Sequence, residues 1–213
     1  MTQAKTQTLR PPYWSQACAE LSARDETMAT LIAQFQNSEL RYRSDPVITL
    51  ARAIVSQQIS VKAAESIWNR LVQELGELSP QRLAQARVPM LRKAGLSERK
   101  AEYLKNVGMH FHKGILVAER WHDMADEAVI EELCQLKGIG RWTAEMFLIF
   151  NLQRPDVFPL ADIGVVKAIN RHYNGDRAIG PRKLGQLDKR WRPWRTVATW
   201  YLWRSLDPIP VEY

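Results

Sequence analysis

The chain has 213 residues, of which 46% are apolar, and a formal net charge of +7. This length is sufficient for one large domain or two small lobes with a buried core. No stretch approaches the roughly 20 apolar residues that span a bilayer, and the N-terminal residues lack the apolar core of a signal peptide. We therefore expect a cytoplasmic protein with no membrane partner, whose basic charge suits a polyanion.

The chain contains two cysteines, Cys18 and Cys134, which lie far apart in the sequence. Two thiols cannot hold a four-cysteine iron–sulfur cluster, and no histidine stands at metal-ligand spacing from either of them. We therefore expect buried free thiols and no iron–sulfur cluster.

Apolar residues recur at three- and four-residue steps, which indicates helices along nearly the whole chain and no strand. Asp45 and Pro46 are typical of a helix N-terminus. Ser60 begins a second helix that ends at Gly76. Further helix starts are expected at Ser79, Ser97 and Asp126.

After Leu136 the chain reads KGIG and then RWTAEMFLIFNL, which is apolar on almost every face and so predicts a buried helix. Residues 153–159, with two prolines, form a connector. Three helices follow: one over 163–173, one that starts at Pro181, and a Trp-rich one over about 194–205. The sequence thus predicts an all-α protein of about ten helices.

Two helices flank the tight turn 136–140, and we expect a helix-hairpin-helix over about 126–151. Gly138 and Gly140 permit positive φ and the close approach of another backbone, while Ile139 between them would anchor the turn in the core. The N–H groups at the start of the second helix, together with its dipole, favour a phosphate. The glycines are equally typical of a simple helix stop, which leaves that alternative open.

The C-terminal segment from Arg171 to Tyr213 holds nine basic and four acidic residues, so +5 of the +7 charge lies there. This concentration predicts a surface that faces phosphates.

The stretch LKGIGRWTAEMFLIFNLQRPDVFPLADIGVVKAI resembles the signature of the helix-hairpin-helix DNA glycosylases, and in particular the bacterial 3-methyladenine glycosylase II branch. LARAIVSQQISVKAA, GLSERKAEYL and RWRPWRTVATWYLWRSL match further motifs in the same order. The resemblance covers about residues 45–206. Larger bacterial relatives carry an additional N-terminal β domain, so we expect the compact, all-helical form.

For the hairpin, the resemblance implies that main-chain N–H groups around Gly138 and Gly140, with the Thr143 hydroxyl, bind a DNA phosphate. It also implies a bound monovalent cation, sodium or potassium, that bridges to this phosphate. The cation would be held by the main-chain carbonyls of Cys134, Leu136 and Ile139. No cofactor is expected for the chemistry itself.

Asp162 is the candidate catalytic residue. Base excision breaks a C–N glycosidic bond through an oxocarbenium-like sugar, which a nearby fixed negative charge stabilises. Asp162 precedes a predicted helix, whose N–H groups would keep the carboxylate ionised. Aspartate is also a favoured N-cap, which is the structural alternative; the matched motif favours catalysis.

The next candidate is Trp142, which stands where strand-nicking members of the superfamily carry a Schiff-base lysine. Without that amine, water is the expected nucleophile and the abasic strand stays intact. Alkylated purines are cationic, and an aromatic pocket attracts them. The resemblance places Trp142 and Trp203 in that pocket, with Met146 one turn from Trp142. Ordinary core packing is our interpretation of Trp68, Trp191 and Trp200.

The target base must rotate out of the duplex, and a wedge residue must fill the gap. The resemblance locates the DNA-contacting wedge at Gln57, Gln58 and Ile59. Relatives often carry Leu where Gln58 stands, so either Gln58 or Ile59 is the wedge, and helix-end packing of Ile59 stays an alternative.

We therefore predict a monomeric, two-lobed protein, with one lobe over 46–158 and a second formed by 1–45 and 159–213. The active site and damaged double-stranded DNA would lie in the cleft between the lobes. The predicted function is that of a monofunctional glycosylase that releases 3-methyladenine and 7-methylguanine in base-excision repair of alkylation damage. The alternatives are a glycosylase for deaminated or oxidised bases, a non-catalytic DNA-binding module and a protein-interaction bundle.

Overall fold

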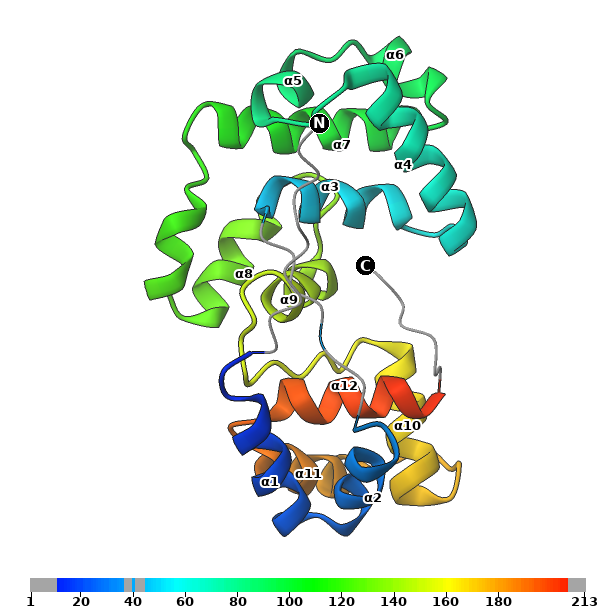
Figure 1. The fold of residues 1–213 in the computed structure, drawn as a ribbon, viewed down its shortest axis with the longest axis vertical. Coiled ribbons are helices and arrows are strands. Elements are labelled where there is room, and N and C mark those ends of the chain that lie inside the picture. Colours follow the sequence, from blue (N-terminus) through cyan, green and yellow to red (C-terminus); the bar gives the residue numbers. More distant parts are fainter. Residues whose placement is uncertain (1–10, 37–39, 41–44, 207–213) are drawn as a thin grey trace. The chain divides into compact units, whose positions relative to one another are not determined.

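A computed structural model describes residues 11–36, 40 and 45–206 of the chain. These residues form twelve α-helices and one 3-10 helix, with no strand among them (Figure 1). The all-α prediction is confirmed. Among the described helices, none has the length and apolar character needed to cross a membrane.

The chain divides into two compact units. Of the described residues, unit 1 contains 11–36, 40 and 148–206, and unit 2 contains 45–147. Residues 148–158, which we expected in the middle lobe, thus belong to unit 1. The reason lies in two hydrogen bonds to α12 (Arg195–Leu206): Thr196 Oγ1 accepts from the Val157 N–H at 3.0 Å, and the Thr196 N–H donates to the Pro155 carbonyl at 3.0 Å.

Unit 2 is built from helices whose N-termini lie where the capping residues predict them. Asp45 accepts from the Ile48 N–H, and Ser60 accepts from the Ala63 N–H. Ser79 and Ser97 cap their helices in the same way. The elements are α3 (Pro46–Ser56), α4 (Val61–Leu75), α5 (Pro80–Gln85), α6 (Val88–Lys93), α7 (Glu98–His112), the 3-10 helix η1 (Ala118–Asp123), α8 (Asp126–Cys134) and most of α9 (Arg141–Phe150).

Helix α7 is central to unit 2, because it packs against α3, α5 and α6. Gly108 permits its close approach to α5, since a Cβ there would lie 2.5 Å from the Leu83 Cβ. Leu104 and Val107 on the same helix are fully buried.

Unit 1 packs around α12, which contacts α1 (Trp14–Arg24), α2 (Glu26–Gln34), α10 (Ile163–Asn174) and α11 (Pro181–Trp191). Helices α1 and α2 were not among the helices predicted from the sequence. Asp25, the buried N-cap of α2, accepts hydrogen bonds from Trp191 Nε1 at 3.1 Å and the Tyr173 hydroxyl at 3.0 Å. These bonds join the N-terminal helices to α10 and α11.

The prediction of buried thiols is wrong for Cys134, which is exposed. As the last residue of α8, it lies where the chain leaves the helix. Cys18 is half-buried, with its Sγ 3.5 Å from the Tyr201 hydroxyl. Neither cysteine forms a disulfide within the described part of the chain.

Candidate functional site

Asp162 is a buried carboxylate at the N-terminus of α10, with 7% of its surface exposed. Its Oδ1 accepts the Val165 N–H at 2.8 Å, which makes it the helix N-cap. The same oxygen accepts Trp203 Nε1 at 2.9 Å. The helix dipole and two donors on one oxygen stabilise a negative charge at a fixed position. Capping and catalysis are therefore compatible roles for this side chain.

Two neighbours bring the Trp203 indole to this carboxylate. Phe150, the last residue of α9, stacks on Trp203 with ring centroids 5.9 Å apart and planes 12° from parallel. At Gly164, a Cβ would lie 3.1 Å from Asp162 Oδ1 and 3.3 Å from Trp203 Cδ1. The glycine thus leaves room for the hydrogen bond between the two side chains.

Sequence reasoning missed both Phe150 and Gly164. Phe150 stands four residues after Met146, so the helical period places the two on one face of α9. Gly164 is a glycine in the first turn of a helix, where the loss of a side chain needs a packing reason. Either observation could have indicated from the sequence that these residues belong to the site.

Two exposed aliphatic residues are close to Asp162 in the sequence. Leu160 and Ile163, on either side of Asp162 in the chain, are 45% and 83% exposed. Asp162 itself is 7% exposed, and a buried polar group of this kind is the informative observation. The chain thus passes from the surface to a buried carboxylate and back within four residues.

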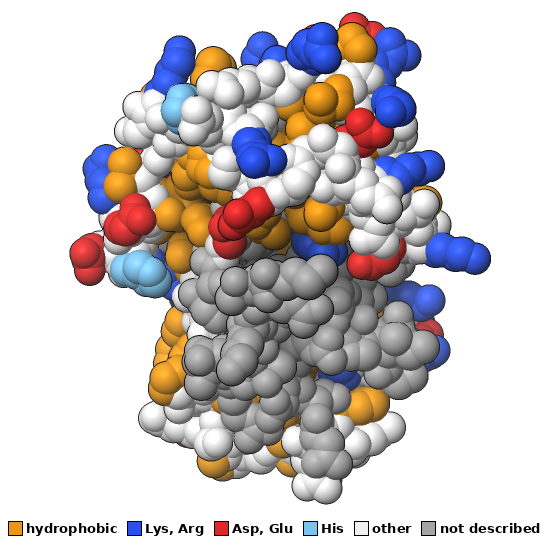
Figure 2. Space-filling model, turned by 45° about the horizontal axis from the view of Figure 1, so that its top comes forward, with side chains coloured by type: hydrophobic (Ala, Val, Ile, Leu, Met, Phe, Trp, Pro, Cys, Tyr) orange, Lys and Arg blue, Asp and Glu red, His pale blue; other side chains and the backbone are white. Residues whose placement is uncertain are grey.

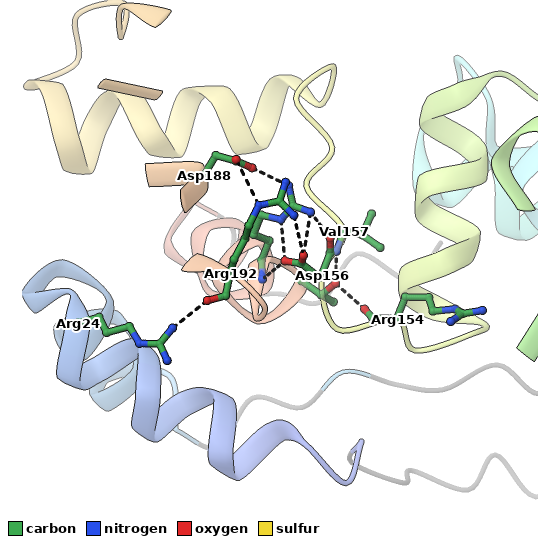
Figure 3. A network of polar contacts seen from close by, with 8 residues as sticks. Arg24, Arg154, Asp156, Val157, Asp188 and Arg192 are labelled. Atoms are coloured by element: carbon green, nitrogen blue, oxygen red, sulfur yellow. Dashed lines mark hydrogen bonds and ion pairs between the residues drawn. The ribbon is translucent and has the colours of Figure 1, made fainter. Parts of the chain in front are cut away.

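The loop before Asp162 is fixed to α12 by an ionic network (Figure 3). Arg195 donates from Nε to Asp156 Oδ1 at 2.6 Å and from Nη1 to Asp188 Oδ1 at 2.6 Å. Arg192 donates to Asp156 Oδ2 at 3.1 Å, and its own carbonyl accepts Arg24 Nη1 at 2.8 Å. Desolvation and these carboxylates oppose each other at Arg195, and the net effect raises the pKa of its guanidinium.

This network changes the interpretation of the basic C-terminal segment. Four of its nine basic residues form ion pairs with carboxylates, namely Arg171, Arg190, Arg192 and Arg195. A fifth, Arg204, is only 2% exposed. Because Asp25 and Asp156 lie outside the segment, they neutralise part of its +5 charge. The charge count therefore overestimates the phosphate-facing surface of this segment.

The helix-hairpin-helix is present within unit 2, with α8, the turn 135–140 and the start of α9 in succession (Figure 1). Ile139 is 4% exposed, which confirms that it anchors the turn in the core. Gly138 has a φ of 87°, and a Cβ there would lie 2.2 Å from the Tyr103 ring.

Gly140 differs from the prediction, because its φ lies outside the positive range. A Cβ at Gly140 would meet no atom within 4 Å, so the backbone faces open space here. Among the described residues, none accepts a hydrogen bond from the N–H of Gly138 or Gly140. Gly138 shapes the turn, whereas Gly140 leaves its surface open.

Other predicted hairpin residues have different exposures. Thr143 is buried, at 6% exposure, and Leu136 is 2% exposed, with its carbonyl accepting the Ile139 N–H at 3.1 Å. Arg141 connects the two helices through an ion pair with Glu127, whose carboxylate raises the pKa of the guanidinium.

The predicted pocket residues Trp142 and Met146 lie four residues apart on α9, half-buried and buried respectively. Both belong to unit 2, whereas Asp162 and Trp203 belong to unit 1. Their grouping in one pocket stays a prediction. Trp68, Trp191 and Trp200 are at most 6% exposed, which confirms their core positions.

The predicted wedge lies in the turn between α3 and α4. Gln57 donates from Nε2 to the Gly138 carbonyl at 2.8 Å, so its side chain holds the hairpin. Gln58 is exposed and has a φ of 57°, an uncommon conformation for a residue with a side chain. Ile59 is 37% exposed. Both remaining candidates are thus available at the surface.

Lysine and arginine side chains are spread around the face of unit 2 drawn in Figure 2, with apolar and acidic side chains between them. Charges of both signs are therefore interspersed on this face.

The chain matches the sequence profile of the HhH-GPD superfamily of base excision DNA repair proteins over residues 51–193. DNA-3-methyladenine glycosylase 1 of Schizosaccharomyces pombe is 33% identical over 199 residues, covering 87% of this chain and 84% of that protein. DNA-3-methyladenine glycosylase of Saccharomyces cerevisiae is 38% identical over 178 residues. That match covers 79% of this chain and 60% of the yeast protein.

Among solved structures, DNA-3-methyladenine glycosidase from Bacillus halodurans superposes with a TM-score of 0.79 at 34% identity. The superposition covers 90% of this chain and 89% of that one. These matches confirm the resemblance seen in the sequence motifs.

Proposed function

Because the chain belongs to the HhH-GPD superfamily of base excision DNA repair proteins, we propose that it is a DNA glycosylase that releases alkylated purines. Its substrate is damaged double-stranded DNA, with 3-methyladenine and 7-methylguanine as the expected bases. It would act where the cell keeps its DNA, which for a bacterial cell is the cytoplasmic nucleoid.

The observation that carries this proposal is the Asp162 carboxylate, held on Oδ1 by the Val165 N–H and the Trp203 indole. When the C1′–N bond breaks, its electron pair leaves with the purine and positive charge develops on the sugar. A fixed carboxylate next to C1′ stabilises that charge. Water then adds to C1′ and loses a proton, which leaves an abasic site.

An alkylated purine suits this site because it already carries a positive charge and leaves as a neutral base. A general acid is therefore not needed for its departure. Trp203, which stacks on Phe150 next to Asp162, offers an aromatic surface of the kind that attracts cationic bases. We propose that Trp142 and Met146 complete the pocket.

The family position of the lyase nucleophile holds a residue without an amine. Nicking of the strand requires an amine that forms a Schiff base with the sugar. Trp142 occupies the position of that lysine in the family motif. The enzyme is therefore monofunctional, and its product is an intact strand with an abasic site.

We propose that the hairpin binds a DNA phosphate through the N–H groups of Gly138 and Gly140, together with the hydroxyl of Thr143. The open space at Gly140 supports this role. Cys134, Leu136 and Ile139 contribute only neutral carbonyl oxygens, a donor set that fits a sodium or potassium ion. Such a cation would add positive charge beneath the phosphate.

The test is a base-release assay with duplexes that contain 7-methylguanine, hypoxanthine or 8-oxoguanine, and with methylated DNA as the source of 3-methyladenine. Release of the methylated purines well above the others supports the proposal. Preferential release of hypoxanthine or 8-oxoguanine would move the enzyme to the deaminated or oxidised class. DNA binding without release of any base would leave only a DNA-binding module.

A further inference from the structure

The turn between α3 and α4 is held in an unusual conformation by contacts from outside itself. Helix α3 ends at Ser56, and Gln58 follows with its left-handed φ of 57°. Such a conformation is unfavourable for a non-glycine residue, and it persists only when neighbouring contacts impose it. Within the turn, the weak bond from the Ile59 N–H to the Ser56 carbonyl, at 3.4 Å, is a poor candidate for that task.

Lys100 on α7 supplies the stronger contacts. Its Nζ donates to the Val55 carbonyl at 2.8 Å and to the Gln57 carbonyl at 2.7 Å. The ammonium thus satisfies carbonyls at the C-terminus of α3, where the helix dipole also favours a cation. Partial burial lowers the pKa of this ammonium, in keeping with a cation drawn out of water.

The residue next to Gln58 is therefore fixed from two directions. This residue is Gln57. Its backbone carbonyl accepts a hydrogen bond from Lys100, and its side-chain amide donates to the Gly138 carbonyl at 2.8 Å. These two bonds restrain Gln57, and through it the start of the left-handed residue Gln58.

One face of α7 fixes the hairpin as well. Tyr103 packs against Gly138, and Asn106 Oδ1 accepts the Lys137 N–H at 3.1 Å. Lys100, Tyr103 and Asn106 recur every three residues, so they lie along one side of the helix. This side of α7 contacts both the turn before Gln58 and the turn that carries Gly138.

We propose that Lys100 is a positioning residue for base flipping, which holds Gln58 in register with the phosphate-binding hairpin. The inference rests on the proposed function, because it assigns Gln58 the task of filling the gap left by the rotated base. A wedge that is ordered before binding loses less conformational entropy when it enters the stack. The register matters because the hairpin phosphate and the gap lie on the same DNA.

The chain contains a matched control. Lys105, also on α7, donates from Nζ to the carbonyl of Ala86, the C-cap of α5, at 2.6 Å. Lys105→Met removes a lysine bond to a helix end, as Lys100→Met does. The bond it removes ends at α5 and not at the turn between α3 and α4. A loss confined to Lys100→Met therefore reports on the turn rather than on helix capping.

The experiment measures flipping by stopped-flow fluorescence of a 2-aminopurine placed beside 7-methylguanine in a duplex. It compares the wild type with Lys100→Met, Lys105→Met and Gln57→Met. Flipping should slow at least about tenfold in Lys100→Met, which loses two charge-assisted hydrogen bonds, and should also slow in Gln57→Met. It should stay at the wild-type rate in Lys105→Met, and Lys100→Arg should restore most of the rate.

Equal flipping rates in Lys100→Met and the wild type would overturn the inference, as would equal slowing in Lys100→Met and Lys105→Met. Should Lys100→Met fail to fold, Lys100→Gln, which loses the charge but keeps a polar end group, is compared with Lys105→Gln in the same way. Base release is recorded separately from fluorescence. Failure of the wild type to release any base would contradict the proposed function without changing the flipping result.

Discussion

The indole N–H of Trp203 and the backbone N–H of Val165 donate to the same oxygen of Asp162, at 2.9 and 2.8 Å. Both bonds end on Oδ1, so they fix the rotation of the carboxylate about its last torsion angle. Trp203 is thus bonded to the candidate catalytic group in addition to offering an aromatic face. The two contributions of this residue can be separated by mutation.

Trp203→Phe keeps an aromatic ring on Phe150 and removes the Nε1 donor. Single-turnover excision of 7-methylguanine should fall about tenfold, because the carboxylate loses one charge-assisted hydrogen bond. Trp203→Ala removes the ring as well and should lose more. The check is the rate at saturating enzyme for both variants; a wild-type rate in Trp203→Phe would show that the bond to Asp162 has no role in excision.

The two hairpin glycines should respond differently to alanine. Gly138→Ala places a Cβ against the Tyr103 ring at a positive φ, and should lower the free energy of unfolding by at least about 1–2 kcal/mol. Gly140→Ala adds a methyl group in open space and should fold normally. Thermal unfolding of both variants tests this contrast.

In DNA binding, Gly140→Ala should weaken affinity about tenfold for damaged and intact duplexes alike, because the methyl group obstructs a phosphate contact that reads no sequence. Fluorescence anisotropy with both duplexes provides the measurement. Unchanged affinity for both would mean that the turn at Gly140 does not contact DNA.

Arg195 should be a structural rather than a DNA-contacting residue. Arg195→Met leaves Asp156 and Asp188 with Arg192 as their remaining cationic partner, and should lower the free energy of unfolding by on the order of 2 kcal/mol. The dependence of DNA affinity on salt should keep its wild-type slope, since no phosphate contact is lost. Lys189→Met on the exposed side of α11 is the control for stability. A shallower salt slope in Arg195→Met would return this residue to the DNA surface.

The enzyme should form no covalent adduct with DNA. Trp142 lacks the amine that a Schiff base requires, so borohydride treatment during turnover should trap nothing. An endonuclease III-type enzyme run in parallel shows that trapping works. A trapped band with this protein would mean that another amine, such as Lys137 or Lys167, acts as a nucleophile.

Much of the fold follows from local signals in the sequence. Asp45, Ser60 and Ser79 cap helices at the positions their side chains predict, because a cap is a bond to a backbone group a few residues away. Helices α1 and α2 escaped prediction. Their anchor is the buried Asp25, which bonds to Trp191 and Tyr173 more than 140 residues later. A pairing between residues so far apart leaves no periodic pattern in the sequence.

The site shows the same division. The motif gave Asp162 its candidate role, and N-capping by this residue was visible in the sequence. The bond to Trp203 was not, since it depends on Gly164 leaving space and on Phe150 supporting the indole. The basic C-terminal segment misled for a related reason: a charge count cannot show that Asp156 pairs with Arg192 and Arg195.

The most direct test of the proposed chemistry is Asp162→Asn. An asparagine oxygen in the place of Oδ1 retains both hydrogen bonds, and asparagine ranks close to aspartate as a helix cap, so folding should be preserved. The charge that stabilises the developing sugar cation is lost, and single-turnover release of 7-methylguanine should fall at least about a hundredfold. DNA affinity should be kept or increase, because the phosphate contacts lie on the hairpin. A folded Asp162→Asn enzyme that releases 7-methylguanine at the wild-type rate would show that Asp162 is only a helix cap.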